Sequence, residues 1–185
     1  GDGKTYTLPQ PFCVIATQNP YGSAGTQLLP DSQMDRFMSC LSLGYPQFQE
    51  EIDIMKKRQT SNPLDDIQPV LTPDTILQYQ QKIDRVYVHD DIYYYIMQII
   101  TATRTHSQVE QGASPRGSLA LMKTAKAYAF LNERDYVIPQ DIQYVAPMIL
   151  AHRLILTYDA KMNKISAHQI IAEILKIIGE PQFKV

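Results

Sequence analysis

The stretch that decides the fold is Pro11-Phe12-Cys13-Val14-Ile15-Ala16-Thr17-Gln18-Asn19-Pro20, in which an apolar run meets a polar turn. Residues 12–16 are apolar throughout and rich in β-formers, a pattern typical of a strand covered on both faces in a parallel α/β sheet. Asn19 lies at the carboxyl end of this predicted strand, where open α/β sheets bind their ligands. One strand cannot form a sheet, so the pattern predicts neighbouring strands.

Flanking segments predict further parts of the same sheet. Residues 4–8 alternate between polar and apolar after Gly1-Asp2-Gly3, which predicts the second strand of a hairpin. Residues 32–38 have the pattern of about two helical turns, and residues 39–44 alternate as another strand. We therefore expect residues 1–45 to be the tail of an α/β domain whose first half lies upstream.

The rest of the chain has a helical pattern. Residues 46–71 are expected to form a connecting helix and a linker, and residues 72–185 a helical bundle, so the predicted fold class is an α/β tail followed by an all-α domain. Helix starts are indicated at Thr72-Pro73, Asp90, Ser114-Pro115, Pro139-Gln140-Asp141 and Ser166. Residues 92–100 leave an alternative open, because their aromatic and branched side chains also suit a strand.

Composition places the chain among ordinary globular proteins. The 185 residues are enough for one large domain or two small ones, and 17 Lys and Arg against 19 Asp and Glu give a formal net charge of −2. This balance lacks both a basic nucleic-acid footprint and the signature of a disordered chain. There is no membrane-length apolar run and no signal-peptide pattern, so we expect a cytoplasmic protein with no nucleic-acid partner. Cys13 and Cys40 are expected to be reduced and buried.

Three polar residues are candidates for phosphate chemistry, and each also has a plain structural interpretation. Asn19 can simply shape the turn in which it lies. Arg36 can pair with Asp35 or Asp31 on a helix face. Arg116 falls in the first turn of a helix, where the helix dipole disfavours a cation by about 0.3 to 1 kcal/mol. A phosphate docked beside Arg116 would explain that position, although exposed arginines at helix starts are often tolerated.

Other chemistries find little support in the sequence. The four histidines are isolated and show no H-E-x-x-H spacing, so no metal site is expected. Paired carboxylates such as Asp90-Asp91 suit helix starts better than acid/base catalysis. The sequence contains neither the G-x-x-x-x-G-K-[ST] of a P-loop nor the G-x-S-x-G of a hydrolase.

Three ordered motifs resemble those of the MoxR-type AAA+ ATPases. They are residues 11–20, then Leu29-Pro30-Asp31-Ser32-Gln33-Met34-Asp35-Arg36-Phe37, then Ser114-Pro115-Arg116-Gly117-Ser118. Residues 136–153 are similar to the lid helix of the same family, so the resemblance covers nearly the whole chain. It implies that the expected fold is the tail of a P-loop AAA+ sheet domain followed by a helical lid.

The resemblance also implies roles for the three candidates. Asn19 falls on the sensor 1 position, whose amide helps to place the attacking water. Arg36 falls on the arginine-finger position, which reaches the nucleotide of a neighbouring subunit. Arg116 falls on the sensor 2 position of the lid, which binds the nucleotide of its own subunit. Catalysis of phosphoryl transfer by positioning and charge neutralisation suits all three.

As cofactors, the resemblance implies ATP and Mg²⁺, held mainly by an upstream half with the P-loop and Walker B residues. The 185-residue chain alone is therefore expected to be inactive. The family further implies a ring, expected to be a hexamer, that remodels proteins in a chaperone-like manner with a von Willebrand A-type partner. Two alternatives stay open: a non-catalytic helical interaction module, and a DNA-linked or chelatase-type AAA+ relative.

Overall fold

The computed structural model describes residues 3–18, 29–60 and 62–181. These residues are mostly helical, with one small sheet of two antiparallel strands. The chain divides into two compact units, one comprising Gly1–Cys13 and Leu41–Tyr79 and the other Val14–Cys40 and Gln80–Val185. The units are described separately below.

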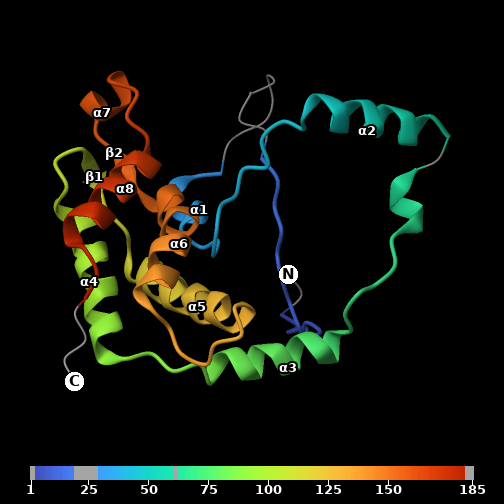
Figure 1. Ribbon diagram of the computed structural model, residues 1–185, viewed down its shortest axis with the longest axis horizontal. Coiled ribbons are helices and arrows are strands. Elements are labelled where there is room, and N and C mark those ends of the chain that lie inside the picture. The colour runs from blue at the N-terminus through green and yellow to red at the C-terminus, as the bar shows by residue number, and fades with distance from the viewer. Residues whose placement is uncertain (1–2, 19–28, 61, 182–185) are drawn as a thin grey trace. The chain divides into compact units, whose positions relative to one another are not determined.

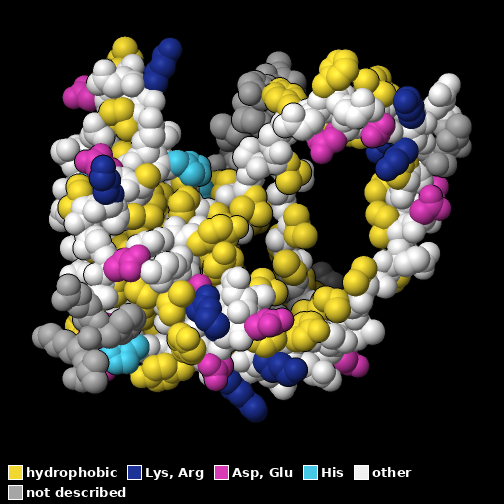
Figure 2. All heavy atoms as spheres, in the orientation of Figure 1, with side chains coloured by type: hydrophobic (Ala, Val, Ile, Leu, Met, Phe, Trp, Pro, Cys, Tyr) yellow, Lys and Arg dark blue, Asp and Glu magenta, His cyan; other side chains and the backbone are white. Residues whose placement is uncertain are grey.

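The first unit contains α2 (Phe48–Thr60), the 3₁₀ helix η1 (Pro63–Asp66) and the start of α3 (Pro73–Asp84). Helix α2 lies within residues 46–71, where a connecting helix is expected. Thr72 caps α3 by accepting a hydrogen bond from the Thr75 backbone N–H at 3.2 Å. Large apolar side chains of this unit lie on its surface, as Figure 2 shows. Among its described residues none is buried, so the unit has no core of its own.

The described residues at 4–8, 12–16 and 39–44, where the sequence predicts strands, form no strand. A strand is held by hydrogen bonds to a neighbour, and no described segment pairs with these three. Ile15 is consequently 89% exposed, although the sequence pattern predicts burial. Cys13 and Cys40 are free thiols as expected but exposed, because the strands that should have buried them do not form.

The second unit has a helical core built from α4 (Asp90–Thr105), α5 (Pro115–Leu131), α6 (Pro139–Leu150) and α8 (Ala167–Ile178). Helix α5 packs against α6 and α4, and α8 packs against α4 and α6 (Figure 1). Fully buried side chains from all four helices meet in this core: Ile92, Tyr95, Ile99, Leu121, Ile142, Ile149, Ile170 and Ile171.

Residues 92–100 form a helix, which settles the alternative left open by their composition. Their buried side chains recur every three to four residues, while Tyr93 and Tyr94 face outward. The cap of α4 is His89, not Asp90, because His89 Nδ1 accepts a hydrogen bond from the Asp91 backbone N–H at 3.2 Å.

Most helix starts follow their sequence signals, whereas small elements were not foreseen. Ser114 and Ser166 cap α5 and α8 as predicted. Helix α6 ends at Leu150 and continues as the 3₁₀ helix η2 (Ala151–Arg153). The sequence analysis missed β1 (Val109–Gln111), which pairs with β2 (Ile155–Leu156), and the short helix α7 (Tyr158–Met162).

Candidate functional site

Two of the three candidate residues lie in the second unit, and the third is not described. Asn19 lies outside the described residues. The four-residue helix α1 (Asp31–Met34) is shorter than the predicted helix 32–38. Arg36 lies two residues beyond its end and is exposed. Arg116 lies in the first turn of α5 with its side chain 63% exposed. Both guanidinium groups are therefore open to an anion from outside this unit.

The start of α5 is fixed by the loop that precedes it. Thr103 Oγ1 accepts a hydrogen bond from the Ala113 backbone N–H at 3.1 Å, and Arg104 Nε donates to the Ala113 carbonyl at 2.9 Å. Gly112 passes so close to α4 that a Cβ atom there would lie 2.6 Å from the Arg104 backbone. Ser114, which follows Ala113, therefore has a fixed position. From there it caps α5 by accepting a hydrogen bond from the Arg116 backbone N–H at 3.2 Å.

Asp35 joins the Arg36 turn to this helix start. Its carboxylate accepts hydrogen bonds from Ser114 Oγ at 2.9 and 3.0 Å. The same carboxylate lies 3.6 Å from Arg116 Nη1 and 3.3 Å from Arg153 Nε. One carboxylate thus faces a hydroxyl and two guanidinium groups, and the residue that carries it is adjacent to Arg36.

Arg153 is the buried member of this cluster, with its side chain 2% exposed. Its Nη2 donates to the carbonyls of Phe37 at 2.6 Å and Asp35 at 3.2 Å, and its Nη1 donates to the carbonyl of Met38 at 3.3 Å. Nη1 also donates to the carbonyl of Ile149 in α6. A planar fork of donors suits this multiple capture of carbonyls, which an ammonium group could not match.

Burial shifts the pKa values of the two basic residues in η2. It lowers the pKa of His152 from its ordinary value of 6.5, and the charge of Arg153 lowers it further, against smaller opposing effects of the Phe37 carbonyl and Asp35. Burial likewise lowers the pKa of Arg153, and the carboxylate of Asp35 opposes that shift. An arginine stays charged at neutral pH even so, so the cluster contains a neutral imidazole beside a buried cation.

Phosphate fits the exposed side of this cluster. The ion pair between Arg116 and Asp35 is 3.6 Å long. Because the Arg116 guanidinium is so exposed, this surface pair contributes little. Arg116 can therefore exchange Asp35 for a phosphate. Among the described residues no hydrogen bond or ion pair holds the Arg36 guanidinium. The part of the chain that the structure describes contains no group of three His, Cys, Asp or Glu side chains suited to a metal ion.

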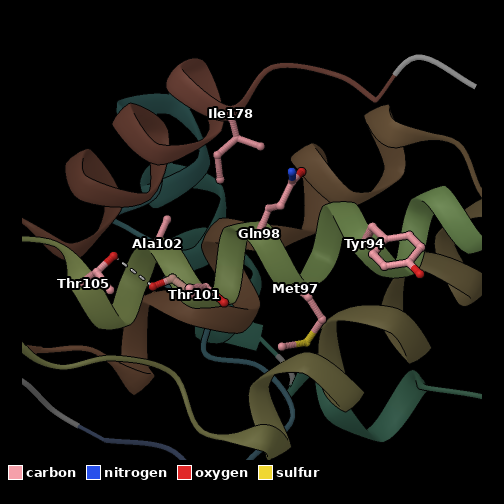
Figure 3. Close-up of a pocket in the computed structure, with 7 residues that line it drawn as sticks. All are labelled: Tyr94, Met97, Gln98, Thr101, Ala102, Thr105 and Ile178. Carbon is pink, nitrogen blue, oxygen red and sulfur yellow. Dashed lines mark hydrogen bonds between the residues drawn. The ribbon is translucent and has the colours of Figure 1, made fainter.

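A shallow groove elsewhere on the unit is poorly suited to a nucleotide. Figure 3 shows its lining by α4 residues from Tyr94 to Thr105 and by Ile178 at the end of α8. Thr105 Oγ1 donates to the Thr101 carbonyl at 3.2 Å within α4, and the groove is mainly apolar and carries no arginine or lysine.

No helix in residues 3–18, 29–60 and 62–181 is both long and apolar enough to span a membrane.

Sequence reasoning missed two members of the Asp35 cluster. It considered Asp35 as a partner of Arg36, whereas the structure pairs Asp35 with Arg116 and Arg153. It gave no role to Arg153 or to the Ser114 hydroxyl beyond capping. A signal for Arg153 was present, since the run from residue 148 to 156 is apolar apart from His152 and Arg153, and a cation in such a run needs buried partners.

Comparisons with known proteins bear on the class of the fold. Residues 101–174 match the family model of the AAA lid domain. Residues 1–39 match the model of ATPases associated with various cellular activities. The crystal structure of a candidate ATPase from Cytophaga hutchinsonii superimposes with a TM-score of 0.89 at 37% identity, covering 98% of this chain and 58% of that one. The fold is therefore that of an AAA+ ATPase, with a helical lid after the α/β region.

Curated relatives narrow the class further. Chaperone MoxR1 of Mycobacterium tuberculosis is 37% identical over 189 residues, covering 97% of this chain and 50% of the relative. The Bacillus subtilis protein YeaC, described as uncharacterized, is 46% identical over 180 residues, covering 97% of this chain and 56% of the relative. These matches support a MoxR-type AAA+ ATPase, and the chain spans about half the length of the curated relatives it matches.

Proposed function

We propose that the complete protein hydrolyses ATP in a ring, with each active site shared between two subunits. Arg36 acts as the arginine finger toward a neighbouring subunit, and Arg116 acts as sensor 2 toward the nucleotide of its own subunit. Asn19 acts as sensor 1 and orients the attacking water. The observation that carries this proposal is the Asp35 cluster, in which one carboxylate links the turn bearing the exposed Arg36 to the helix start bearing the exposed Arg116.

Electrostatics give each arginine its role. Phosphoryl transfer spreads negative charge over the γ-phosphate and the leaving oxygen, and positioned cations stabilise that charge. Arg116 lies at the start of a helix. A phosphate bound there therefore interacts favourably with both the guanidinium and the helix dipole. ATP with Mg²⁺ supplies the phosphoanhydride bond that is broken. Residues beyond this chain hold most of that nucleotide, so the 185 residues alone have no turnover in this proposal.

Its work is remodelling of other proteins. The name of the M. tuberculosis relative describes a chaperone, and the family match makes a similar role the best-supported one for this chain. We extend the proposal to a hexameric ring in the cytoplasm and to a partner with a von Willebrand A-type domain. The formal net charge of −2 favours this function over a DNA-linked one, because DNA-binding proteins carry a basic surface.

The test is ATP turnover of the complete protein at a concentration at which it forms rings, comparing the parent with Arg36→Ala. An arginine finger contributes roughly 10³ to 10⁵ in rate in other NTPases, so turnover should fall by about 10³ with nucleotide affinity unchanged. Arg85→Ala removes another exposed arginine and is the matched control, which should keep parental turnover.

Other outcomes would contradict the proposal. Equal turnover in the parent and Arg36→Ala would leave Arg36 as an exposed surface residue without a role in turnover. No turnover in either protein would favour the helical interaction module, and tight, steeply salt-dependent DNA binding would favour the DNA-linked relative.

A further inference from the structure

The backbone on both sides of Arg36 is held by one buried side chain. Arg153 donates to the carbonyls of Asp35, Phe37 and Met38, which together flank Arg36. These donors come from η2, which follows α6 directly and contacts α1. The direction in which Arg36 projects is therefore set by a residue 117 positions later in the sequence, 153 − 36, within the helical lid.

Asp35 carries the same connection to the start of α5. Ser114 Oγ donates to the Asp35 carboxylate and accepts from the Arg116 backbone N–H, so this hydroxyl touches both residues. Gly117, one turn into α5, leaves room for the Arg153 stem, since a Cβ there would lie 3.3 Å from Arg153 Cδ. A displacement of the first turn of α5 must therefore move Asp35, move Arg153 or break these contacts.

The three contacts of Asp35 differ in strength. The Ser114 hydrogen bonds are 2.9 and 3.0 Å long and the Arg153 ion pair is largely buried at 3.3 Å. The Arg116 contact is the longest at 3.6 Å and belongs to the most exposed partner. A phosphate can therefore take Arg116 from Asp35 while the other two contacts remain.

We propose that Asp35 and Arg153 are positioning residues that transmit the position of the Arg116 helix start to the Arg36 finger. The inference rests on the proposed function and adds a coupling path to it: nucleotide bound by Arg116 in one subunit sets how that subunit presents Arg36 to its neighbour. Arg153 fixes the backbone around Arg36, and the Asp35 carboxylate ties that backbone to Ser114. Neither residue touches the nucleotide.

Asp35→Asn in the complete protein tests the coupling, because it removes the charge and keeps the size and one acceptor for Ser114. Misplacing a catalytic group by about 1 Å costs on the order of 100-fold in rate, so we expect kcat to fall roughly tenfold to 100-fold with KM for ATP changed by less than about twofold. Asp31→Asn, which changes an exposed acid at the start of α1, is the matched control and should keep the parental kcat. A parental kcat in Asp35→Asn would overturn the inference.

Mixed rings separate a coupling defect from loss of structure. In rings of Asp35→Asn and Arg36→Ala subunits, every finger is misplaced or absent, so turnover should stay at or below that of Asp35→Asn alone. A rise to about a quarter of parental turnover would place the Asp35→Asn defect in its own nucleotide site and overturn the coupling. If Asp35→Asn does not fold, Arg153→Lys replaces it, since lysine keeps the charge but lacks the fork that spans the three carbonyls.

The outcomes for this inference and for the proposed function are distinct. An inactive parent, or an Arg36→Ala protein as active as the parent, contradicts the proposed function itself. An active parent with an impaired Arg36→Ala, together with an unimpaired Asp35→Asn, leaves the proposed function standing and rejects the coupling alone.

Discussion

Two arginine–aspartate pairs lie near the two ends of α6 and are built differently. At its start, Asp141 is 1% exposed and meets Arg134 through two parallel contacts, and its carboxylate also accepts from the Ile138 backbone N–H at 2.9 Å. Beyond its end, Arg153 is the buried partner, and Asp35 is 20% exposed and shared with Ser114 and Arg116. In the first pair the acid is enclosed, and in the second the acid faces outward.

The difference separates a closed pair from a shared one. Arg134 and Asp141 are 7 residues apart. They form hydrogen bonds with each other and with the start of α6, and so hold one helix in place. Asp35 and Arg153 are 153 − 35 = 118 residues apart and leave the Asp35 carboxylate reachable by an exposed arginine. A bidentate closed pair resists exchange, whereas a shared carboxylate can lose one partner and keep the others.

The largest expected effect is a loss of stability when the closed pair of Arg134 and Asp141 is broken. Asp141→Asn should lower the free energy of unfolding by about 3 kcal/mol, because it leaves Arg134 without its carboxylate and weakens the α6 cap. Asp35→Asn should cost only about 1 kcal/mol, since Arg153 keeps its carbonyl partners. Urea unfolding of the 185-residue chain measures both, and an equal or larger loss in Asp35→Asn would remove the distinction between the pairs.

A smaller effect is expected on nucleotide binding by Arg116. Arg116→Ala in the complete protein should weaken ATP binding to the same subunit about tenfold, since a charge-assisted hydrogen bond contributes roughly 1.5 to 3 kcal/mol. Titration of a fluorescent nucleotide measures the Kd, with Arg134→Ala at the closed pair as a control that should bind normally if it folds. Unchanged affinity in Arg116→Ala would take this residue out of the nucleotide site.

The smallest effect is on pH dependence and comes from His152, next to Arg153. Because burial lowers the pKa of His152 in the folded chain, the unfolded chain takes up a proton near pH 6.5 while the folded chain does not. This imidazole therefore makes stability fall as pH drops below about 6.5 toward the folded pKa, and adds no slope above that window. His152→Gln should flatten the stability curve in that range, measured as thermal unfolding against pH. An unchanged slope would show that His152 titrates normally.

Sequence patterns predicted the parts of the fold that are decided locally. Ser114-Pro115 and Thr72-Pro73 mark helix starts because a cap and a proline act on their own first turn. Residues 12–16 were predicted as a strand and are not one, because strand formation needs a partner that no described segment provides. The boundary at residue 89 was misplaced by one because an imidazole nitrogen, and not a carboxylate, accepts the capping hydrogen bond.

The candidate site likewise has one part that the sequence predicts and one part that it does not. Arg36 and Arg116 stand in recognisable motifs, so the sequence alone nominates them. Their connection through Asp35 and Arg153 could not be predicted, because contacts between residues more than 100 positions apart depend on packing of the whole unit. A buried arginine in an apolar run signals that partners exist but does not say which ones.

The most direct test of the central claim is complementation between Arg36→Ala and Arg116→Ala in rings assembled from mixed subunits of the complete protein, at an ATP concentration well below the Kd of Arg116→Ala so that both variants are impaired. If Arg36 serves the neighbour and Arg116 serves its own subunit, an Arg36→Ala pocket beside an Arg116→Ala finger contains both arginines. Random mixing at equal amounts should then restore turnover at about a quarter of the sites. No rise above the activity of the separate variants would contradict an active site shared between subunits.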